Sequence, residues 1–318
     1  MKKTFILLTL SFTAFILGGC QETETYDVIT TLFPQYDMAT YIAGDDLTVH
    51  NILPFGTSPH TFEITSKDRQ MIETSSLFIY TSDTLENWVT DITFTSTLFL
   101  NLELELNIDH DHHDDHEEDH DDHDDHEEVL DLHYWTNPDT MKHMVDLILN
   151  HMIEVKPELA STFTQRAESY KTQLNGYIED LHLFLEIYAS DDVHLYIAGH
   201  NAMADFGEYF NIEIVSLFPD FIPDAELSSL ELTTFISTLN EHQVKAFFIE
   251  PLFDSEPLAA QTIKDTLEAQ NQPTSFYELH QFHNISANDF ENNLSLFDIF
   301  QKNIENIKLV VELNYGTR

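Results

Sequence analysis

Residues 158–188 read ELASTFTQRAESYKTQLNGYIEDLHLFLEIY, and this uninterrupted segment decides the fold. It contains no Pro and a single Gly, and its apolar side chains recur every three or four residues, as one face of an α-helix requires. At 1.5 Å per residue, the 31 residues predict a rod of roughly 46 Å, which suits a spine between two lobes. The apolar positions are Leu159, Phe163, Ala167, Tyr170, Leu174, Tyr177, Leu181 and Leu185.

Strand and helix patterns alternate on both sides of this spine. Before it we predict strands at 26–33, 47–53 and 77–80 and helices at 35–43, 66–74 and 139–155. After it we predict strands at 193–198, 212–217, 246–249 and 275–279 and helices at 202–210, 229–242, 256–269 and 290–313. Such a rhythm is typical of parallel sheets covered by helices.

The domain organisation that follows is an α/β fold with two lobes of parallel-sheet βα units, joined by a long rigid α-helix. We place the N-terminal lobe at 21–157, the linker helix at 158–189 and the C-terminal lobe at 190–318.

The first residues read as an export signal. Lys2 and Lys3 precede an apolar run at 5–17, which is too short to span a membrane, because a spanning helix needs about 20 apolar residues. Leu17-Gly18-Gly19-Cys20 resembles the bacterial lipobox, in which the Cys becomes the lipidated first residue. We therefore expect 1–20 to be a lipoprotein signal peptide, Cys20 to be the lipid attachment site, and the protein to be held at the outer face of the cell membrane. A plain signal peptide with an incidental Cys is the alternative.

The excess of acidic residues limits the kinds of ligand that the chain can bind. The chain carries 13 Lys+Arg against 57 Asp+Glu, a formal net charge of −44. Nucleic-acid binding is excluded as a function, because phosphate recognition needs clustered cations. Cations are the natural ligands of such a chain, and a single Cys excludes both a Cys-rich zinc module and an intrachain disulfide.

An acidic insert interrupts the N-terminal lobe at 109–128. All twenty residues are His, Asp or Glu, so the segment cannot join a core and is expected to form a loop. It could gather Zn²⁺ weakly and raise its concentration near a tighter site, or it could be a solvated tract with no specific role. Its seven histidines are His110, His112, His113, His116, His120, His123 and His126.

Three other histidines stand at the ends of predicted elements. His60 follows a predicted strand, His133 precedes a helix, and His200 follows Gly199 where a strand gives way to a helix. Ligands bind at the carboxyl ends of strands in open α/β sheets, and three imidazoles with one further ligand make a tetrahedral zinc site. We read the remaining histidines outside the insert and the predicted site as surface or packing residues: His50, His143, His151, His182, His194 and His242.

The motifs around these histidines resemble the zinc-binding lipoproteins and periplasmic receptors of ABC-type metal importers, the ZnuA and AdcA cluster. The family motifs read roughly Glu-Pro-His-x-Phe/Tyr-Glu-Pro and Asp-Pro-His-x-Trp, and a third has His followed by Ala and aromatics. The corresponding stretches here are 58–64 (SPHTFEI), 131–135 (DLHYW) and 200–206 (HNAMADF). The resemblance covers essentially the whole mature chain, and the His-rich insert also resembles the zinc branch.

The resemblance implies two α/β lobes around a rigid helix, with Zn²⁺ in the interlobe cleft. It implies His60, His133 and His200 as metal ligands, and a fourth ligand just after the last strand, where the family usually has an acid or a water. His283 occupies the position of the family's Glu, and His280 and Glu278 are the next candidates. The implied partners are an ABC-type permease in the membrane and the lipid anchor, and the implied state is a monomer.

Ligand softness favours zinc. Manganese receptors of the same cluster use two His and two carboxylates, whereas His200 stands at the third position here, and nitrogen donors favour Zn²⁺ over Mn²⁺. The alternatives are a receptor for manganese or another divalent metal, and a surface metal-storage or adhesin lipoprotein. We expect metal affinity to fall as pH drops through about 6–6.5, because imidazole must be neutral to bind.

An enzyme is not expected. The one His-Glu-x-x-His match, at 116–120, lies inside the acidic insert, where no apolar face could dock a catalytic helix. No Gly-x-Ser-x-Gly motif and no phosphate-binding glycine loop occur in the sequence.

Overall fold

Two parallel four-stranded sheets form the centres of two lobes in the computed structural model, which describes residues 25–108, 132–218, 228–251 and 258–316. In the N-lobe the strand order is β2-β1-β3-β4, and in the C-lobe it is β6-β5-β7-β8. The strands are β1 Val28–Thr30, β2 Val49–Asn51, β3 Leu77–Tyr80, β4 Leu98–Asn101, β5 His194–His200, β6 Glu213–Phe218, β7 Ala246–Ile249 and β8 Ser275–Glu278. The predicted α/β class and its parallel pairing are confirmed.

Helices connect and cover these strands. The α-helices are α1 Phe33–Ala43, α2 Ser66–Thr74, α3 Leu102–Leu106, α4 Pro138–Val155, α5 Ala160–Leu185, α6 Ala204–Phe210, α7 Ser229–Glu241, α8 Leu258–Ala269, α9 Ala287–Glu291 and α10 Leu296–Tyr315. Short 3₁₀ turns at Pro59–Thr61 and Tyr134–Thr136 lie in the loops that carry two of the predicted site histidines.

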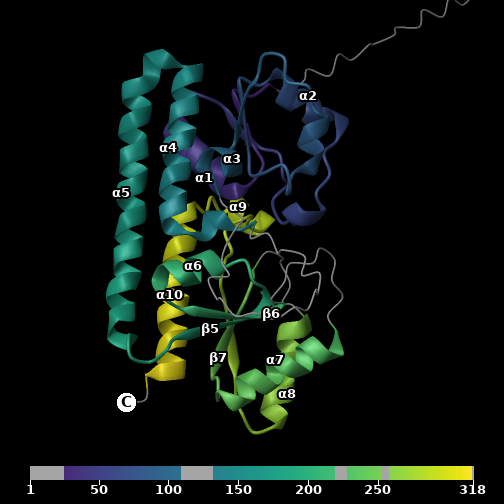
Figure 1. Ribbon diagram of the computed structural model, residues 1–318, viewed down its shortest axis with the longest axis vertical. Coiled ribbons are helices and arrows are strands. Elements are labelled where there is room, and N and C mark those ends of the chain that lie inside the picture. Colours follow the sequence, from purple (N-terminus) through teal and green to yellow (C-terminus); the bar gives the residue numbers. More distant parts are fainter. Residues whose placement is uncertain (1–24, 109–131, 219–227, 252–257, 317–318) are drawn as a thin grey trace, which may run out of the picture.

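The predicted spine is α5, extended by 3₁₀ turns at Pro157–Leu159 and Glu186–Tyr188. Figure 1 shows it running along one side of both lobes, with α4 beside its upper part and α10 beside its lower part. Its buried stripe follows the predicted spacing with two exceptions: Ile178 is buried in place of Tyr177, and Leu159 is only partly buried. Burial of this stripe against both lobes is what makes the helix a rigid element.

One hydrophobic core is continuous through the molecule. It includes Ile79 of the N-lobe sheet, Phe163 and Leu181 near the two ends of α5, and Ile197 and Phe248 of the C-lobe sheet, all fully or almost fully buried. Packing at interior density resists sliding, so the shared core holds the two lobes in a fixed relation.

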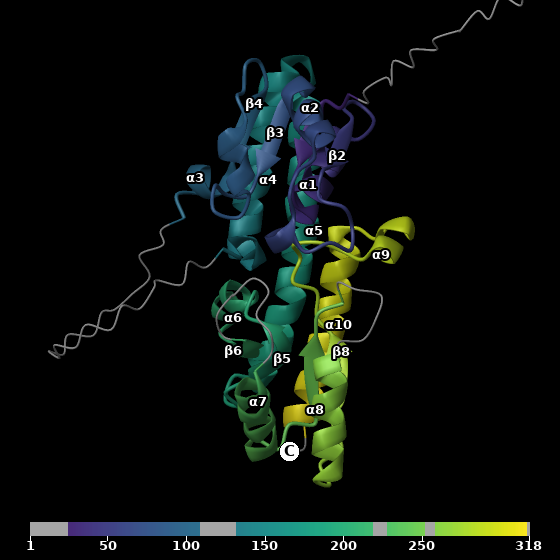
Figure 2. The same cartoon turned by 90° about the vertical axis from the view of Figure 1, so that its right-hand side faces the viewer.

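A buried segment after β8, Leu279–Ser286, reaches back to the N-lobe, and we name it the crossing segment. Its backbone bonds the N-lobe through Phe33 N to His283 O (3.2 Å) and Gly56 N to Ile285 O (2.8 Å). The Asn284 amide donates to Pro54 O (3.0 Å) and Thr57 O (2.7 Å). Figure 2 shows α9, which follows this segment, at the level where the lobes meet.

Two predicted elements have wrong boundaries for local reasons. The helix predicted at 290–313 is two helices, α9 and α10, because Asn293 adopts a left-handed φ of 58° between them. The strand predicted at 26–33 ends at Thr30, because Pro34 in the first turn starts α1 at Phe33. The strand β4 and the short helix α3 were not predicted.

The export signal with Cys20 and the seven histidines of the insert lie outside the described residues, so those predictions stay predictions. Within the described ranges, no helix has both the length and the apolarity that crossing a membrane would need.

Candidate metal centre

The N-lobe supplies two histidines from loops at the carboxyl side of its sheet. His60 lies in the 3₁₀ turn that follows β2, next to the buried Pro59. His133 is 3% exposed and is followed by Trp135, whose ring lies 5.2 Å from the imidazole, centroid to centroid. Trp135 is fully buried and its Nε1 donates to the carbonyl of Gln281 in the crossing segment (3.3 Å).

A buried polar network fixes the loop that carries His133. The Tyr134 hydroxyl donates to Thr81 O (2.9 Å) at the end of β3. The carboxylate of Glu86 accepts from the backbone N–H groups of Thr81 (3.1 Å) and Ser82 (2.9 Å). Burial raises the pKa of Glu86, while the hydrogen bonds that it accepts oppose that rise. The network anchors this loop to the strand end, where ligands of open α/β sheets bind.

The C-lobe supplies the other two candidate histidines, His200 and His283. His200 is the last residue of β5, and the register with β6 shifts between Ile197 and His200, so the strand end departs from regular pairing. The Gln281 side chain donates to His200 O (3.3 Å), so Gln281 contacts both the His200 and the Trp135 loops. His283 lies in the crossing segment and is 1% exposed.

These side chains converge where the lobes meet. One nitrogen from each of His60, His133 and His200 lies within 4.8 Å of the others. The ring centroids are 5.6 Å apart for His60–His133, 5.8 Å for His60–His200 and 5.2 Å for His133–His200. The ring of His283 lies 6.0 Å from that of His60 and 6.1 Å from that of His200. Three of the predicted ligands are thus brought together, and the fourth lies next to them.

Burial lowers the pKa of His60, His200 and His283. Desolvation, aided by the neighbouring His133 and His200, lowers the pKa of His60 to about 2. Desolvation and His133 lower the pKa of His200 to about 3, and desolvation followed by the neighbouring histidines lowers the pKa of His283 well below its usual value. These shifts favour the neutral, metal-binding form of His60, His200 and His283. The expectation that metal affinity falls below about pH 6–6.5 stays a prediction.

His283 has one nitrogen engaged and one available. Its Nε2 lies 3.1 Å from Oε1 of Glu250, the residue that directly follows β7. Its Nδ1 is buried and has no hydrogen-bond partner among the described residues. Burial raises the pKa of Glu250 to about 8, and a nearby dication would favour its ionised form.

The other candidates for the fourth ligand are Glu278 and His280. Glu278 forms an ion pair with Lys302 of α10, so its carboxylate is directed to the helix and not to the histidines. His280 exchanges two backbone hydrogen bonds with the Asn303 side chain (2.9 and 2.8 Å). Burial lowers the pKa of His280 to about 4.

Sequence reasoning missed Glu250. Its signal was present, because a lone acid directly after the buried strand AFFI stands at the same sheet edge as His200. The rule that located the histidines at strand ends would have located Glu250 as well.

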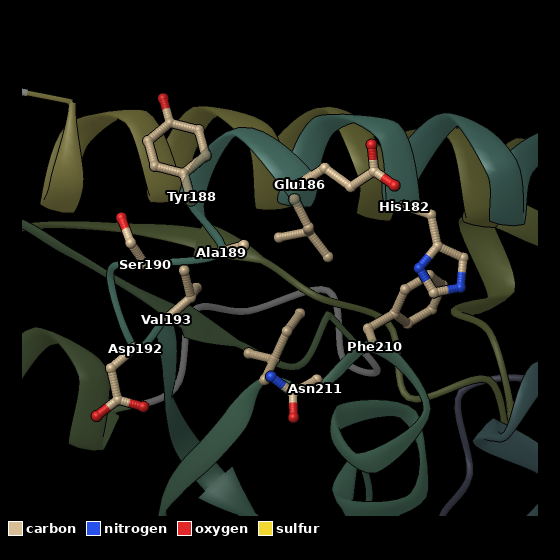
Figure 3. Close-up of a pocket in the computed structure, with 11 residues that line it drawn as sticks. His182, Glu186, Tyr188, Ala189, Ser190, Asp192, Val193, Phe210 and Asn211 are labelled. Atoms are coloured by element: carbon tan, nitrogen blue, oxygen red, sulfur yellow. The ribbon is translucent and has the colours of Figure 1, made fainter.

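A separate hollow of about 350 Å³ lies at the far end of α5. Figure 3 shows His182, Glu186, Asp192 and Phe210 around it. The His182 ring packs against Phe210, centroid to centroid 4.7 Å, which is a packing role. None of the converging histidines lines this hollow.

Converging neutral imidazoles in a buried setting can bind a borderline metal ion. Histidine nitrogen coordinates Zn²⁺ at about 2.0–2.1 Å, usually in a tetrahedron. Two of the candidate ligands come from each lobe, so an ion at this position would link the lobes.

Comparisons with known proteins agree with the geometry. The family model "ZnuA: Zinc-uptake complex component A periplasmic" matches residues 28–309. The chain is 24% identical to the zinc-binding protein AdcA of Streptococcus pyogenes, covering 98% of this chain and 62% of AdcA. It is 25% identical to the high-affinity zinc uptake system protein ZnuA of Bacillus subtilis, covering 88% of this chain and 86% of that protein. The chain thus spans less than two thirds of the AdcA relatives' length.

The fold has counterparts among solved structures. The periplasmic zinc binding protein TroA from Treponema pallidum superposes with a TM-score of 0.73 at 19% identity, covering 91% of this chain and 99% of TroA. This likeness confirms the two-lobed architecture with its long helix.

Proposed function

This chain belongs to the ZnuA family of periplasmic zinc-uptake components, and from that premise we propose that it captures Zn²⁺ outside the cytoplasm and delivers it to an ABC-type importer. The observation that carries the proposal is the convergence of His60, His133 and His200 within 4.8 Å. The family's relatives named above are zinc-binding and zinc-uptake proteins. Zn²⁺ is cargo in this scheme, so the site has to bind and release it and needs no catalytic group.

The ligand set that we propose is His60, His133, His200 and Nδ1 of His283. Nδ1 of His283 is supported by its burial and by the engagement of Nε2 with Glu250 (3.1 Å). The ion pair between Glu278 and Lys302 argues against Glu278. Four nitrogen donors favour zinc, copper or nickel over manganese, which prefers oxygen, so a manganese receptor is the weaker alternative.

Capture relies on preformed, neutral donors. Because burial already holds His60 and His200 deprotonated, the ion need not displace protons from them near neutral pH. The hydrogen bonds of the crossing segment keep the donors of both lobes in place before the ion arrives. Preorganisation of this kind lowers the ordering cost of binding.

The cellular setting belongs to the same proposal. Lipidation at Cys20 would hold a monomer at the outer face of the membrane, within reach of the permease. The histidines of the 109–128 insert would gather Zn²⁺ weakly near the tight site.

The proposal is tested by metal competition on the purified protein. We expect one tight Zn²⁺ site per chain, with Mn²⁺ unable to displace zinc at a hundredfold excess. The variant His60→Ala should lose this site. Unchanged zinc affinity in His60→Ala, or preferential retention of Mn²⁺ by the unaltered protein, would refute the function.

A further inference from the structure

We propose that Glu250 is a positioning residue for the metal site, which holds His283 through Nε2 so that Nδ1 becomes the fourth ligand. The inference rests on the proposed function and deepens it, because it names what makes a histidine work where the related motif has Glu.

The hydrogen bond selects the nitrogen. A neutral imidazole has an N–H donor on one nitrogen and a lone pair on the other. The group that one nitrogen contacts therefore determines which nitrogen carries the proton. An ionised Glu250 can only accept, so with its Oε1 at 3.1 Å, Nε2 of His283 carries the proton and donates it. Nδ1 then keeps the lone pair, and this buried atom has no hydrogen-bond partner among the described residues.

The backbone leaves only the ring to be oriented. Phe282 adopts a left-handed φ of 67°, His283 N donates to Gln281 O (3.0 Å), and Phe33 N donates to His283 O (3.2 Å). On the other side, Leu279 N donates to Ile249 O (2.8 Å), which ties the crossing segment to the residue before Glu250. The carboxylate therefore acts from a strand end on a ring whose main chain is already fixed.

A carboxylate that holds a metal-bound histidine has a measurable effect on metal affinity. Carboxylates that accept a hydrogen bond from a metal-bound histidine fix its tautomer and raise its basicity, and their loss typically costs 10–100-fold in metal affinity. Removing the charge of Glu250 should therefore weaken zinc binding in that range while leaving three ligands in place.

The test is a double-variant cycle on the full chain. Zinc affinity, measured by chelator competition, should fall about 10–100-fold in Glu250→Gln and should not fall further when Glu250→Gln is added to His283→Ala. The matched control is Glu213→Gln, because Glu213 also lies 3.2 Å from a histidine nitrogen, Nε2 of His194, at the opposite end of the C-lobe. The control should bind zinc as the unaltered protein does.

Independent readouts separate positioning from mere support of the fold. The d–d spectrum of bound Co²⁺ should shift in Glu250→Gln, and nitrogen chemical shifts of His283 should lose the single Nε2–H tautomer. In His283→Glu, which installs the acid of the related motif, Glu250→Gln should no longer weaken zinc binding and should improve it by removing a neighbouring like charge.

Two kinds of failure are distinguishable. If His60→Ala retains tight zinc, the proposed function is wrong. If His60→Ala loses zinc but Glu250→Gln binds zinc like the unaltered protein, the role proposed for Glu250 is wrong and the function stands. The same conclusion follows if Glu250→Gln weakens zinc binding equally in the presence and absence of His283.

Discussion

Two groups of histidines lie at opposite ends of the C-lobe sheet, and they differ in their surroundings. At the carboxyl ends of the strands, His200 and His283 join the N-lobe histidines in a buried cluster. At the start of the sheet, His194 Nε2 lies 3.2 Å from Glu213 and 3.4 Å from Asp192. Nearby, Nδ1 of His242 lies 2.7 Å from the Tyr196 hydroxyl.

The difference shows that histidine content does not make a metal site. The rings of His194 and His242 are 6.0 Å apart, a spacing close to that of the interlobe cluster. Their ring nitrogens contact exposed acids and a hydroxyl at a hollow of about 320 Å³, whereas one nitrogen from each of His60, His133 and His200 lies within 4.8 Å of the others. Convergence from two lobes distinguishes the interlobe group, and it arises from tertiary structure.

The largest effect is expected from removing an interlobe ligand. His133→Ala should weaken zinc binding by more than the roughly 100-fold that loss of an outer-shell partner costs, because a direct donor is lost. His194→Ala is the matched change at the other end of the C-lobe sheet. Calorimetry with both variants measures the contrast, and equal losses would erase the distinction between the two groups.

The pH dependence of the free energy of unfolding tests the burial of His60. Because the pKa of folded His60 is about 2 and the ordinary value is 6.5, the unfolded chain takes up a proton below pH 6.5 that the folded chain does not. His60 therefore lowers the free energy of unfolding by about 1.4 kcal/mol for each pH unit below 6.5.

The measurement is the difference in unfolding free energy, without metal, between the unaltered protein and His60→Gln at pH 7 and pH 5. Taking this difference cancels the opposing contributions of Asp37 and Glu250, whose pKa values are raised by burial to about 6 and about 8. A difference that does not change with pH would mean that His60 titrates normally.

A third prediction concerns the acidic insert. Deleting 109–128 should leave the tight zinc site intact, because its ligands lie on other segments, and should remove several weak sites. Zinc stoichiometry by equilibrium dialysis, at low and high free metal, reports both classes. Loss of the tight site on deletion would assign the insert a direct role in binding.

The smallest effect is expected at the start of the C-lobe sheet. His242→Ala removes the part-buried partner of the Tyr196 hydroxyl and should change zinc affinity less than twofold. Chelator competition is sensitive enough to detect a larger change, which would place a second tight site there.

Much of this arrangement could be predicted from the chain because the signals are local. The spacing of Phe163, Leu174 and Leu181 predicted α5, and the position of His200 after an apolar strand predicted its place at the sheet edge. Helix α2 and strands β3 and β7 have the predicted bounds, since capping and apolar runs delimit them.

The remainder depends on contacts that no local pattern encodes. The pairing of Glu250 with His283 joins residues from two loops, and the lowered pKa values of His60 and His200 arise only after burial. The break between α9 and α10 depends on the left-handed Asn293, which helical periodicity alone does not reveal.

The most direct test is an anomalous-diffraction map, at the zinc absorption edge, of crystals grown with one equivalent of Zn²⁺. We predict a single strong peak between the lobes, about 2.0–2.1 Å from one nitrogen each of His60, His133 and His200. A peak at the His194 and His242 cluster, or none between the lobes, would contradict the account.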